Sequence, residues 1–347
     1  MLPSRPVAMC DATTEPVERD HRMYEGEARP LYVEVTNGSG QTWPGGMEAE
    51  PLIRLSYHLR SAEGALLQAD GPRSPLQAPL APGDSQIVPV MVEAPESAGA
   101  YLLEIDVVHE HVRWFDVPAR IELEVVPAGR RENNVPHLRG LPRRTRIPRV
   151  LHQIWVGSKP MPDEQRDFVA GWQRRHPTWE HRLWTDADLP ALDISPALAR
   201  RAVTPAELSN LVRYSVVERY GGVYIDTDFE CLRPLDRLAR GLDGFAACSK
   251  PGIVAPGLFG AVPGHPAIAR SASLARKVLG TRYPETTSGP ILFTHVMWDF
   301  PEFTIYPPEL FYPYLWDEMH RRRERFDDAY AVHHWTLSWR ADAAREH

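Results

Sequence analysis

Residues 204–230 read TPAELSNLVRYSVVERYGGVYIDTDFE, which predicts a helix, a double-glycine stop and a short apolar strand. Thr204 is a natural N-cap, Pro205 suits the first helical turn, and Glu207 completes a capping box. Gly221 and Gly222 end the helix. The predicted buried stripe consists of Leu208, Leu211, Val212 and Val216. A helix that leads directly into an apolar strand is typical of an α/β domain, here expected to have a largely parallel sheet.

The predicted strand ends in Asp226 and Asp228. Because strand side chains alternate between faces, both carboxylates leave the strand on the same side. Two like charges this close repel each other unless a positive group lies nearby. The carboxyl ends of parallel strands are also where α/β sheets place their sites. A divalent cation, Mg²⁺ or Mn²⁺, with a phosphate-bearing substrate fits these observations.

A metal-dependent phosphatase of the haloacid dehalogenase type is a lesser alternative, because such enzymes also begin with an apolar strand and two spaced aspartates. Those enzymes normally have Thr or Val two residues after the second aspartate, where this chain has Glu230. Phe229 does not provide the small turn expected there. The local sequence therefore disfavours the phosphatase.

The two halves of the chain differ in pattern. From residue 148, strands alternate with helices: strands at 149–157 and 180–186, helices at 162–177 and 195–202. Before residue 127, five strand-like segments lie between turn clusters, at 31–37, 53–60, 86–94, 101–110 and 120–126. Such spacing indicates a β-sandwich of immunoglobulin or fibronectin type. Its aromatic residues are expected to be core packing, with a sugar-stacking surface as the alternative: Trp43, Tyr57, Trp114 and Phe115.

The 347 residues are enough for two domains. We predict a β-sandwich accessory domain over 1–128, an Arg/Pro-rich linker over 129–147 and an α/β transferase domain over 148–347. The stretch 128–149 has seven arginines and one acidic residue. It is expected to be a solvated tether, and peripheral contact with anionic membrane lipid is the alternative.

Composition excludes several classes of protein. The formal net charge of −7 gives no basic field for nucleic acid. Three widely spaced cysteines without a CxxC suggest neither a disulfide framework nor a zinc site. Neither a signal peptide nor a membrane-spanning run is recognised, so a cytoplasmic location is expected.

Five segments, in order, resemble glycosyltransferase family 32, which includes fungal initiating mannosyltransferases and vertebrate α-1,4-galactosyltransferases. They are IPRVLHQIWVG (147–157), HPTWEHRLWTDADL (176–189), the stretch 206–236, TTSGPILFT (286–294) and AVHHWTLSW (331–339). The resemblance covers roughly residues 147–340. It implies a GT-A fold, a nucleotide-diphosphate sugar donor, Mn²⁺ or Mg²⁺, and transfer with retention of configuration.

The resemblance also implies roles for residues near the aspartates. Asp226 would lie near the ribose and sugar of the donor, and Asp228 would bind the metal. Trp155 would stack on the nucleobase, or else be a buried tryptophan at a strand end. The hydroxyls of the donor sugar would be bound by three residues of the helix, Ser209, Asn210 and Arg213. The family has aspartate at the position of Asn210. Asparagine keeps an acceptor but loses the charge, which bears on donor choice and rate.

Other roles fall in the last third of the chain. His333, or its neighbour His334, would ligate the metal or contact phosphate. Ser338 would approach the metal, and Trp339 the leaving oxygen. Weaker candidates for donor binding are Tyr224, Thr287, Ser288 and Gly289.

The resulting hypothesis is a bacterial, metal-dependent retaining hexosyltransferase. Its donor is expected to be a UDP-sugar, with GDP-mannose as the alternative. The acceptor would be a hydroxyl of a glycan, a lipid-linked glycan or a small molecule, in the cytoplasm or at the inner face of the membrane. A catalytically impaired protein that only binds sugar nucleotides or polysaccharide is the main alternative, and Asn210 is the feature in its favour.

Overall fold

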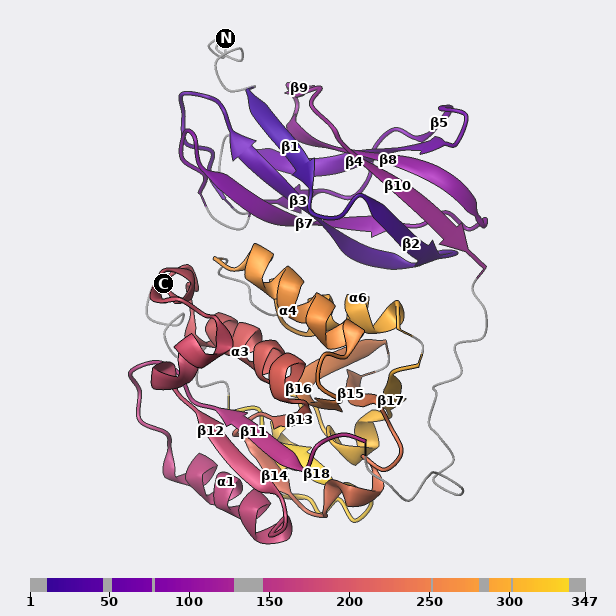
Figure 1. The fold of residues 1–347 in the computed structure, drawn as a ribbon. Helices are drawn as coiled ribbons and strands as arrows, with labels where there is room; N and C mark the ends of the chain where they lie inside the picture. Colours follow the sequence, from indigo (N-terminus) through magenta and orange to yellow (C-terminus); the bar gives the residue numbers. More distant parts are fainter. Residues whose placement is uncertain are drawn as a thin grey trace. The chain divides into compact units, whose positions relative to one another are not determined.

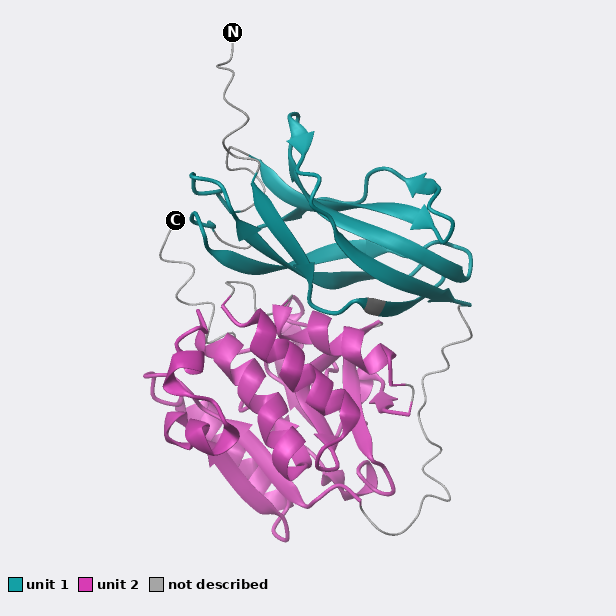
Figure 2. Ribbon diagram, turned by 45° about the horizontal axis from the view of Figure 1, so that its top comes forward, with its two compact units in different colours: residues 1–131 teal, residues 132–347 magenta. Residues whose placement is uncertain are grey.

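The computed structural model describes residues 11–45, 52–76, 79–127, 146–250, 252–280, 287–300 and 302–336. The chain divides into two compact units, Met1–Arg131 (unit 1) and Glu132–His347 (unit 2), which Figure 2 colours separately. The predicted linker lies outside the described residues, apart from residues 146 and 147. Within the described ranges, no helix is long and apolar enough to cross a membrane.

Unit 1 consists of two β-sheets. One has the order β1-β3-β7, with β1 at Ala12–Pro16, β3 at Ala28–Asn37 and β7 at Ser85–Glu93. The other has the order β2-β10-β8-β4-β5, with β6 paired to β4 and β9 to β8. Its strands are β2 (Asp20–Tyr24), β10 (Ala119–Val126), β8 (Gly99–His109), β4 (Ile53–Ser61), β5 (Leu66–Gln68), β6 (Ser74–Pro75) and β9 (Arg113–Trp114). All five predicted strands are present, and the missed ones are short or lie at sheet edges.

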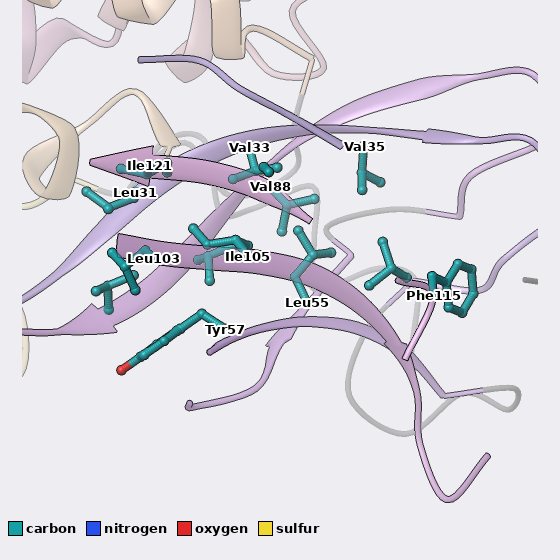
Figure 3. Close-up of a cluster of buried hydrophobic side chains, with 14 of the residues drawn as sticks. Leu31, Val33, Val35, Leu55, Tyr57, Val88, Leu103, Ile105, Phe115 and Ile121 are labelled. Carbon is teal, nitrogen blue, oxygen red and sulfur yellow. The ribbon is translucent and has the colours of Figure 1, made fainter. Parts of the chain in front are cut away.

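Alternating residues of both sheets meet in one apolar core, so unit 1 is a β-sandwich. Figure 3 shows Leu31, Val33 and Val88 from one sheet beside Leu55 and Ile105 from the other. The burial pattern of β10, BeBeBeBi, is the period of two expected for a strand with one buried face.

The aromatic residues of unit 1 are mainly core residues, as expected. Trp43, Tyr57 and Phe115 are buried, and Trp43 packs edge-on against Phe115 with ring centroids 5.5 Å apart. Trp114 alone is half-buried, with its ring against His58 and the Arg73 guanidinium 5.5 Å from its centroid. A continuous aromatic surface for sugar stacking is therefore not formed by these four side chains.

Unit 2 is built on a six-stranded sheet with the order β12-β11-β13-β16-β15-β17. These strands are β12 (Glu180–Trp184), β11 (Val150–Ile154), β13 (Gly222–Ile225), β16 (Ile253–Ala261), β15 (Gly244–Lys250) and β17 (Thr304–Tyr306). β11 pairs in parallel with β12 and β13, and β15 with β17, but β16 is antiparallel to both neighbours. The sheet is thus mixed rather than largely parallel, because β15 and β16 form a hairpin.

Helices cover the sheet of unit 2, and a two-stranded ribbon lies beside it (Figure 1). The helices are α1 (Asp163–Arg175), α2 (Pro196–Ala199), α3 (Pro205–Tyr220), α4 (Pro266–Val278) and α6 (Pro290–Trp298). Short 3₁₀ turns are η2 (Asp186–Leu192), η3 (Leu235–Arg237), η4 (Pro308–Leu310) and η5 (Met319–Arg323). The ribbon pairs β14 (Phe229–Cys231) with β18 (Ala331–His333).

Helix α3 begins and ends as the sequence predicts, but two details differ. The Thr204 hydroxyl accepts from the Glu207 amide, and Gly221 caps the C-terminus with φ 62°. The Glu207 carboxylate accepts from the amides of Val203 and Gly280, rather than completing a capping box at Thr204. The helix is also buried well beyond its apolar stripe, because it packs against α4, β11, β13 and β16. Its polar residues therefore face the interior of unit 2.

Candidate active site

The turn between α3 and β13 fixes the direction of the strand that ends in the aspartates. Gly222 has φ 94°, and a side chain there would lie 2.6 Å from the Val150 carbonyl oxygen. The Gly221 carbonyl accepts from His152 Nε2 at 2.8 Å, while His152 Nδ1 accepts from the Trp184 indole N–H at 3.1 Å. His152 is therefore held neutral, and desolvation lowers its pKa to about 4.

Asp226 follows β13 directly and pairs with α3. Its Oδ1 lies 3.2 Å from the Arg213 guanidinium, and the Tyr224 hydroxyl donates to the same oxygen. Arg213 also donates to the Pro256 carbonyl at 3.0 Å and lies over the Tyr224 ring. Desolvation and the neighbouring Asp228 raise the pKa of Asp226, although Arg213 opposes this. Asp226, Arg213 and Tyr224 are called the Asp226 side of the site.

Asp228 pairs instead with the C-terminal part of the chain. Its Oδ1 lies 3.0 Å from His333 Nε2, and its Oδ2 accepts from the amide and the hydroxyl of Thr336 at 3.0 and 3.1 Å. Desolvation acts to raise the pKa of Asp228, but the nearby His333 and the hydrogen bonds from His333 and Thr336 outweigh it and hold this pKa well below its usual range. Asp228, His333 and Thr336 are called the Asp228 side.

The two sides meet at His333. Its Nε2 is 3.0 Å from Asp228 and 3.9 Å from Asp226 Oδ2, and one ligand atom from each of the three residues lies within 4.8 Å of the others. Two carboxylates with an imidazole form a donor set that suits Mn²⁺ and, through its oxygens, Mg²⁺. In the described structure, Arg213 beside Asp226 and His333 beside Asp228 are the partners that the paired aspartates require.

A bulge in β16 leaves room for the Asp226 carboxylate. Pairing with β15 shifts between Phe259 and Ala255, and Gly257 lies in the skipped stretch. The Gly257 carbonyl accepts from the Asp226 amide at 2.8 Å. A Cβ on Gly257 would lie only 2.8 Å from Asp226 Oδ2. Bulges commonly adjust backbones beside active sites, and this one lets a carboxylate lie against the strand.

The polar residues of α3 reach a second loop. Asn210 Nδ2 donates to the Ser288 hydroxyl at 3.0 Å, and the Tyr214 hydroxyl donates to the Ser288 carbonyl at 2.9 Å. Ser209 accepts from Arg213 at 3.4 Å through its hydroxyl. Gly289 is the N-cap of α6. The structure therefore joins Asn210 to Ser288 and Ser209 to Arg213.

The side chains of two expected residues bond to groups other than the aspartates. Trp155 is half-buried just after β11, and its indole N–H donates to the Lys159 carbonyl at 2.7 Å. His334, the alternative metal ligand, bonds through Nδ1 to Tyr314 and through Nε2 to Glu230. The His334 ring stacks on Phe168 and lines a hollow of about 730 Å³ formed largely by α1 and η5. His334 is thus turned away from Asp228. Ser338 and Trp339 lie outside the described residues.

Sequence reasoning missed four residues around the aspartates. Thr336 bonds to Asp228, and Gln165 of α1 donates to Thr336 at 2.7 Å and accepts from Thr227 at 3.2 Å. Tyr312 and Gly257 lie beside Asp226. Only Gly257 could have been found from the sequence, because a Pro-Gly pair inside a strand pattern suggests a bulge or a close approach of two backbones. The other three have no distinctive spacing.

The segment that holds this geometry matches a known protein family. Residues 162–242 match the family described as glycosyltransferase sugar-binding region containing DXD motif. The matched segment contains α1, α3 and both aspartates, with Arg213. Together with the names of the relatives below, this match supports a glycosyltransferase.

Curated relatives match part of the chain. Inositol phosphoceramide mannosyltransferase 3 of Schizosaccharomyces pombe is 28% identical over 162 residues, which cover 44% of this chain and 45% of that protein. Mannosyl phosphorylinositol ceramide synthase CSH1 of Saccharomyces cerevisiae is 32% identical over 128 residues, covering 35% and 33%. The chain therefore spans about half or less of these relatives. Among solved structures, PaToxG Glycosyltransferase has a TM-score of 0.35 at 13% identity, covering 44% of this chain and 68% of that one, a likeness too weak to assign a fold.

Proposed function

We propose that unit 2 transfers a sugar from a nucleotide-diphosphate donor to an acceptor hydroxyl, with retention of configuration. The observation that carries this proposal is the cluster of Asp226, Asp228 and His333 at the end of β13, beside the buried Arg213. Charged groups are rarely this buried without a functional reason, and perturbed carboxylates of this kind concentrate at reaction sites. The family match over the same residues supports it.

The proposed cofactor is Mn²⁺ or Mg²⁺. Asp228, His333 and Asp226 would hold the ion, because their ligand atoms already lie close together. A bound divalent cation supplies Lewis-acid stabilisation of the negative charge that grows on a departing diphosphate.

The residues of the chain itself would orient the donor. Arg213 is a fixed positive charge, since the attraction of Asp226 outweighs desolvation and keeps its pKa above the ordinary value. It would offset negative charge on the diphosphate or donate a hydrogen bond to a sugar hydroxyl. Asn210, held by Ser288, would accept from or donate to a sugar hydroxyl. The proposed role of these groups is to bind and orient the donor.

The proposed reaction is attack by the acceptor hydroxyl on the face of the sugar that the diphosphate leaves, with the leaving phosphate as the base. Asp226 is paired with Arg213 and Tyr224, and Asp228 with His333 and Thr336, so the proposal assigns both carboxylates to metal and donor binding rather than to nucleophilic attack. Isolation of a glycosyl group covalently bound to Asp226 or to Glu230 would overturn this mechanism.

For the donor sugar and the acceptor, we propose only a chemical class. The sequence favours a UDP-sugar, whereas the names of the relatives are those of mannosyltransferases, which favours mannose as the transferred sugar. The same names refer to inositol phosphoceramide, so a glycolipid is the proposed class of acceptor. We place the enzyme in a bacterial cytoplasm, at the inner face of the membrane, with an immunoglobulin-like sandwich in unit 1 as an accessory domain.

The experiment is a panel of UDP-sugars and GDP-mannose, each with and without Mn²⁺, scored by thermal stabilisation and by slow donor hydrolysis. We expect one nucleotide sugar to raise the melting temperature in the presence of metal and to be hydrolysed. Stabilisation by sugar nucleotide without hydrolysis or transfer would instead support the binding-protein alternative. No response to any nucleotide sugar would contradict the proposed function.

A further inference from the structure

Tyr312 is a buried tyrosine that the family motifs do not include, and it lies against both sides of the site. It follows η4 and is 3% exposed. Its ring packs edge-on against Phe229, with centroids 5.3 Å apart, and against His333 at 5.5 Å. Phe229 follows Asp228 directly in the sequence, and His333 contacts the Asp228 carboxylate. The ring is therefore fixed by the residues that flank the aspartates.

The Tyr312 hydroxyl and the Asp226 carboxylate face the same small space beside Gly257. A Cβ on Gly257 would lie 2.9 Å from the Tyr312 hydroxyl oxygen and 2.8 Å from Asp226 Oδ2. The two oxygens therefore cannot be farther apart than the sum of these distances. A phenol hydroxyl carries its proton at neutral pH and can donate it in a hydrogen bond.

That proton has no acceptor. The Tyr312 hydroxyl is buried, and the Leu258 backbone amide is a donor to its oxygen, but among the described residues none accepts a hydrogen bond from it. Other buried tyrosines of unit 2 are satisfied: the Tyr306 hydroxyl donates to the Leu238 carbonyl at 2.7 Å, and the Tyr214 hydroxyl to Ser288. A buried hydroxyl proton without an acceptor is unfavourable, so such groups in native proteins call for an explanation. A ligand oxygen would supply the missing acceptor.

We propose that Tyr312 and Asp226 together bind one hydroxyl group of the nucleotide-sugar donor. A sugar hydroxyl can donate to the Asp226 carboxylate and accept from the Tyr312 O–H, which makes it complementary to this pair. An ionised phosphate oxygen is not complementary, because it has no proton to donate to the carboxylate. The hydroxyl belongs to the transferred sugar or to the ribose. This inference rests on the proposed function and adds Tyr312 as a donor-binding residue.

The test is Tyr312→Phe, with Tyr306→Phe as the matched control. Both changes remove one buried hydroxyl and keep the ring. Tyr312→Phe should leave the melting temperature unchanged or raise it, because it removes an unsatisfied donor. It should weaken binding of the preferred nucleotide sugar about tenfold, or about 1.4 kcal/mol. Tyr306→Phe should lower the melting temperature, because the Leu238 carbonyl loses its donor, and should leave binding unchanged.

Calorimetry with the nucleotide sugar and with its nucleoside diphosphate alone, both with Mn²⁺, identifies the hydroxyl. A loss confined to the nucleotide sugar supports the transferred sugar, and an equal loss for both ligands supports the ribose. Unchanged affinity in Tyr312→Phe, with normal binding by the wild type, would overturn the role of Tyr312 alone. A lower melting temperature would also overturn it, since the hydroxyl proton would then have an acceptor in the protein. If the wild type binds no nucleotide sugar, the proposed function fails as well.

Discussion

Asp226 and Asp228 both follow the end of β13, but the residues that pair with them come from different parts of the chain. Asp226 is paired within a local segment: Arg213 lies 13 positions earlier on α3, and Tyr224 lies two positions earlier on β13. Asp228 is paired with residues from the far end of the chain, and Thr336 lies 108 positions later. The Asp226 side is thus part of the helix–strand framework, whereas the Asp228 side is completed by the C-terminal segment.

Both sides bear on the stability of the fold as well as on ligand binding. Desolvation raises the pKa of Asp226, while His333 and Thr336 hold the pKa of Asp228 well below its usual range. Changes on the Asp226 side should therefore weaken the fold as well as the site, because they expose buried charge in the framework. Changes on the Asp228 side should act on metal and donor binding and also on stability, because a lowered pKa means that His333 and Thr336 stabilise the charged form of Asp228 in the folded protein.

The largest effect on stability is expected from Arg213→Gln, compared with Arg219→Gln on the same helix. Arg213 is buried and pairs with Asp226, whereas Arg219 is about half exposed and pairs with the exposed Asp193. Loss of Arg213 leaves a desolvated carboxylate without its partner, so the free energy of unfolding should fall by about 3–5 kcal/mol. Arg219→Gln should change it by less than about 0.5 kcal/mol. Equal, small losses in urea denaturation would contradict a framework role for the Asp226 side.

A pH-dependent effect is expected from His152, which supports the turn before β13. Its pKa is about 4 in the folded protein and about 6.5 when unfolded, so the unfolded chain binds the extra proton between these values. The neutral imidazole therefore contributes fully above pH 6.5, and its contribution, about 3 kcal/mol, is lost as the pH falls towards 4.

His152→Gln isolates this effect, because an amide can also accept from Trp184 and donate to the Gly221 carbonyl. Urea denaturation between pH 4 and 7 should show a steeper loss of stability in the wild type than in the variant. Parallel curves would mean that His152 does not control acid stability.

A moderate effect on activity is expected from Gly257→Ala. The new methyl group would lie 2.8 Å from Asp226 Oδ2 and 2.9 Å from the Tyr312 hydroxyl, so the carboxylate must shift. Donor hydrolysis should fall by about tenfold, since small misplacements of binding groups have effects of this order or larger. Gly171→Ala in α1 is the control, because its nearest neighbour would be 3.8 Å away. Similar rates of donor hydrolysis in both variants would show that the reaction does not depend on the space beside Gly257.

The smallest effect is expected from Thr336→Val on the Asp228 side. Valine keeps the shape but loses the hydroxyl that donates to Asp228, while the amide of residue 336 still donates. The change should weaken metal-dependent donor binding by about 1 kcal/mol and leave the melting temperature within a few degrees of the wild type. A large fall in the melting temperature without any change in metal-dependent donor binding would contradict a binding role for the Thr336 hydroxyl.

The sequence predicted the Asp226 side more fully than the Asp228 side, and the physical reason is the range of the contacts. Helix caps and the glycine stop are local patterns, so α3 and β13 could be derived from them. Strand alternation was the wrong reason for the closeness of the aspartates, because β13 ends at Ile225 and a turn from Asp226 to Phe229 carries both carboxylates. The link between Asp228 and His333 followed only from a family resemblance. The hydroxyls of Thr336 and Tyr312 reach the aspartates through tertiary folding, which has no periodic signature.

The same limit explains the errors in the fold. The sequence did not indicate that β16 runs antiparallel, because a nine-residue apolar strand has the same pattern in either direction. It also could not separate His333 from His334, since the orientation of each ring depends on what surrounds the end of β18. Tyr314 and Glu230 hold His334, and Asp228 holds His333.

The most direct test compares Asp228→Asn with Glu230→Gln, two isosteric changes at neighbouring carboxylates. With Mn²⁺ and the preferred nucleotide sugar, Glu230→Gln should keep both thermal stabilisation and donor hydrolysis, because its carboxylate bonds to His334 outside the cluster. Asp228→Asn should lose the metal-dependent stabilisation, and hydrolysis should fall at least about a hundredfold, equivalent to several kcal/mol. Retention of both properties in Asp228→Asn, at the level of Glu230→Gln, would contradict the assignment of this site.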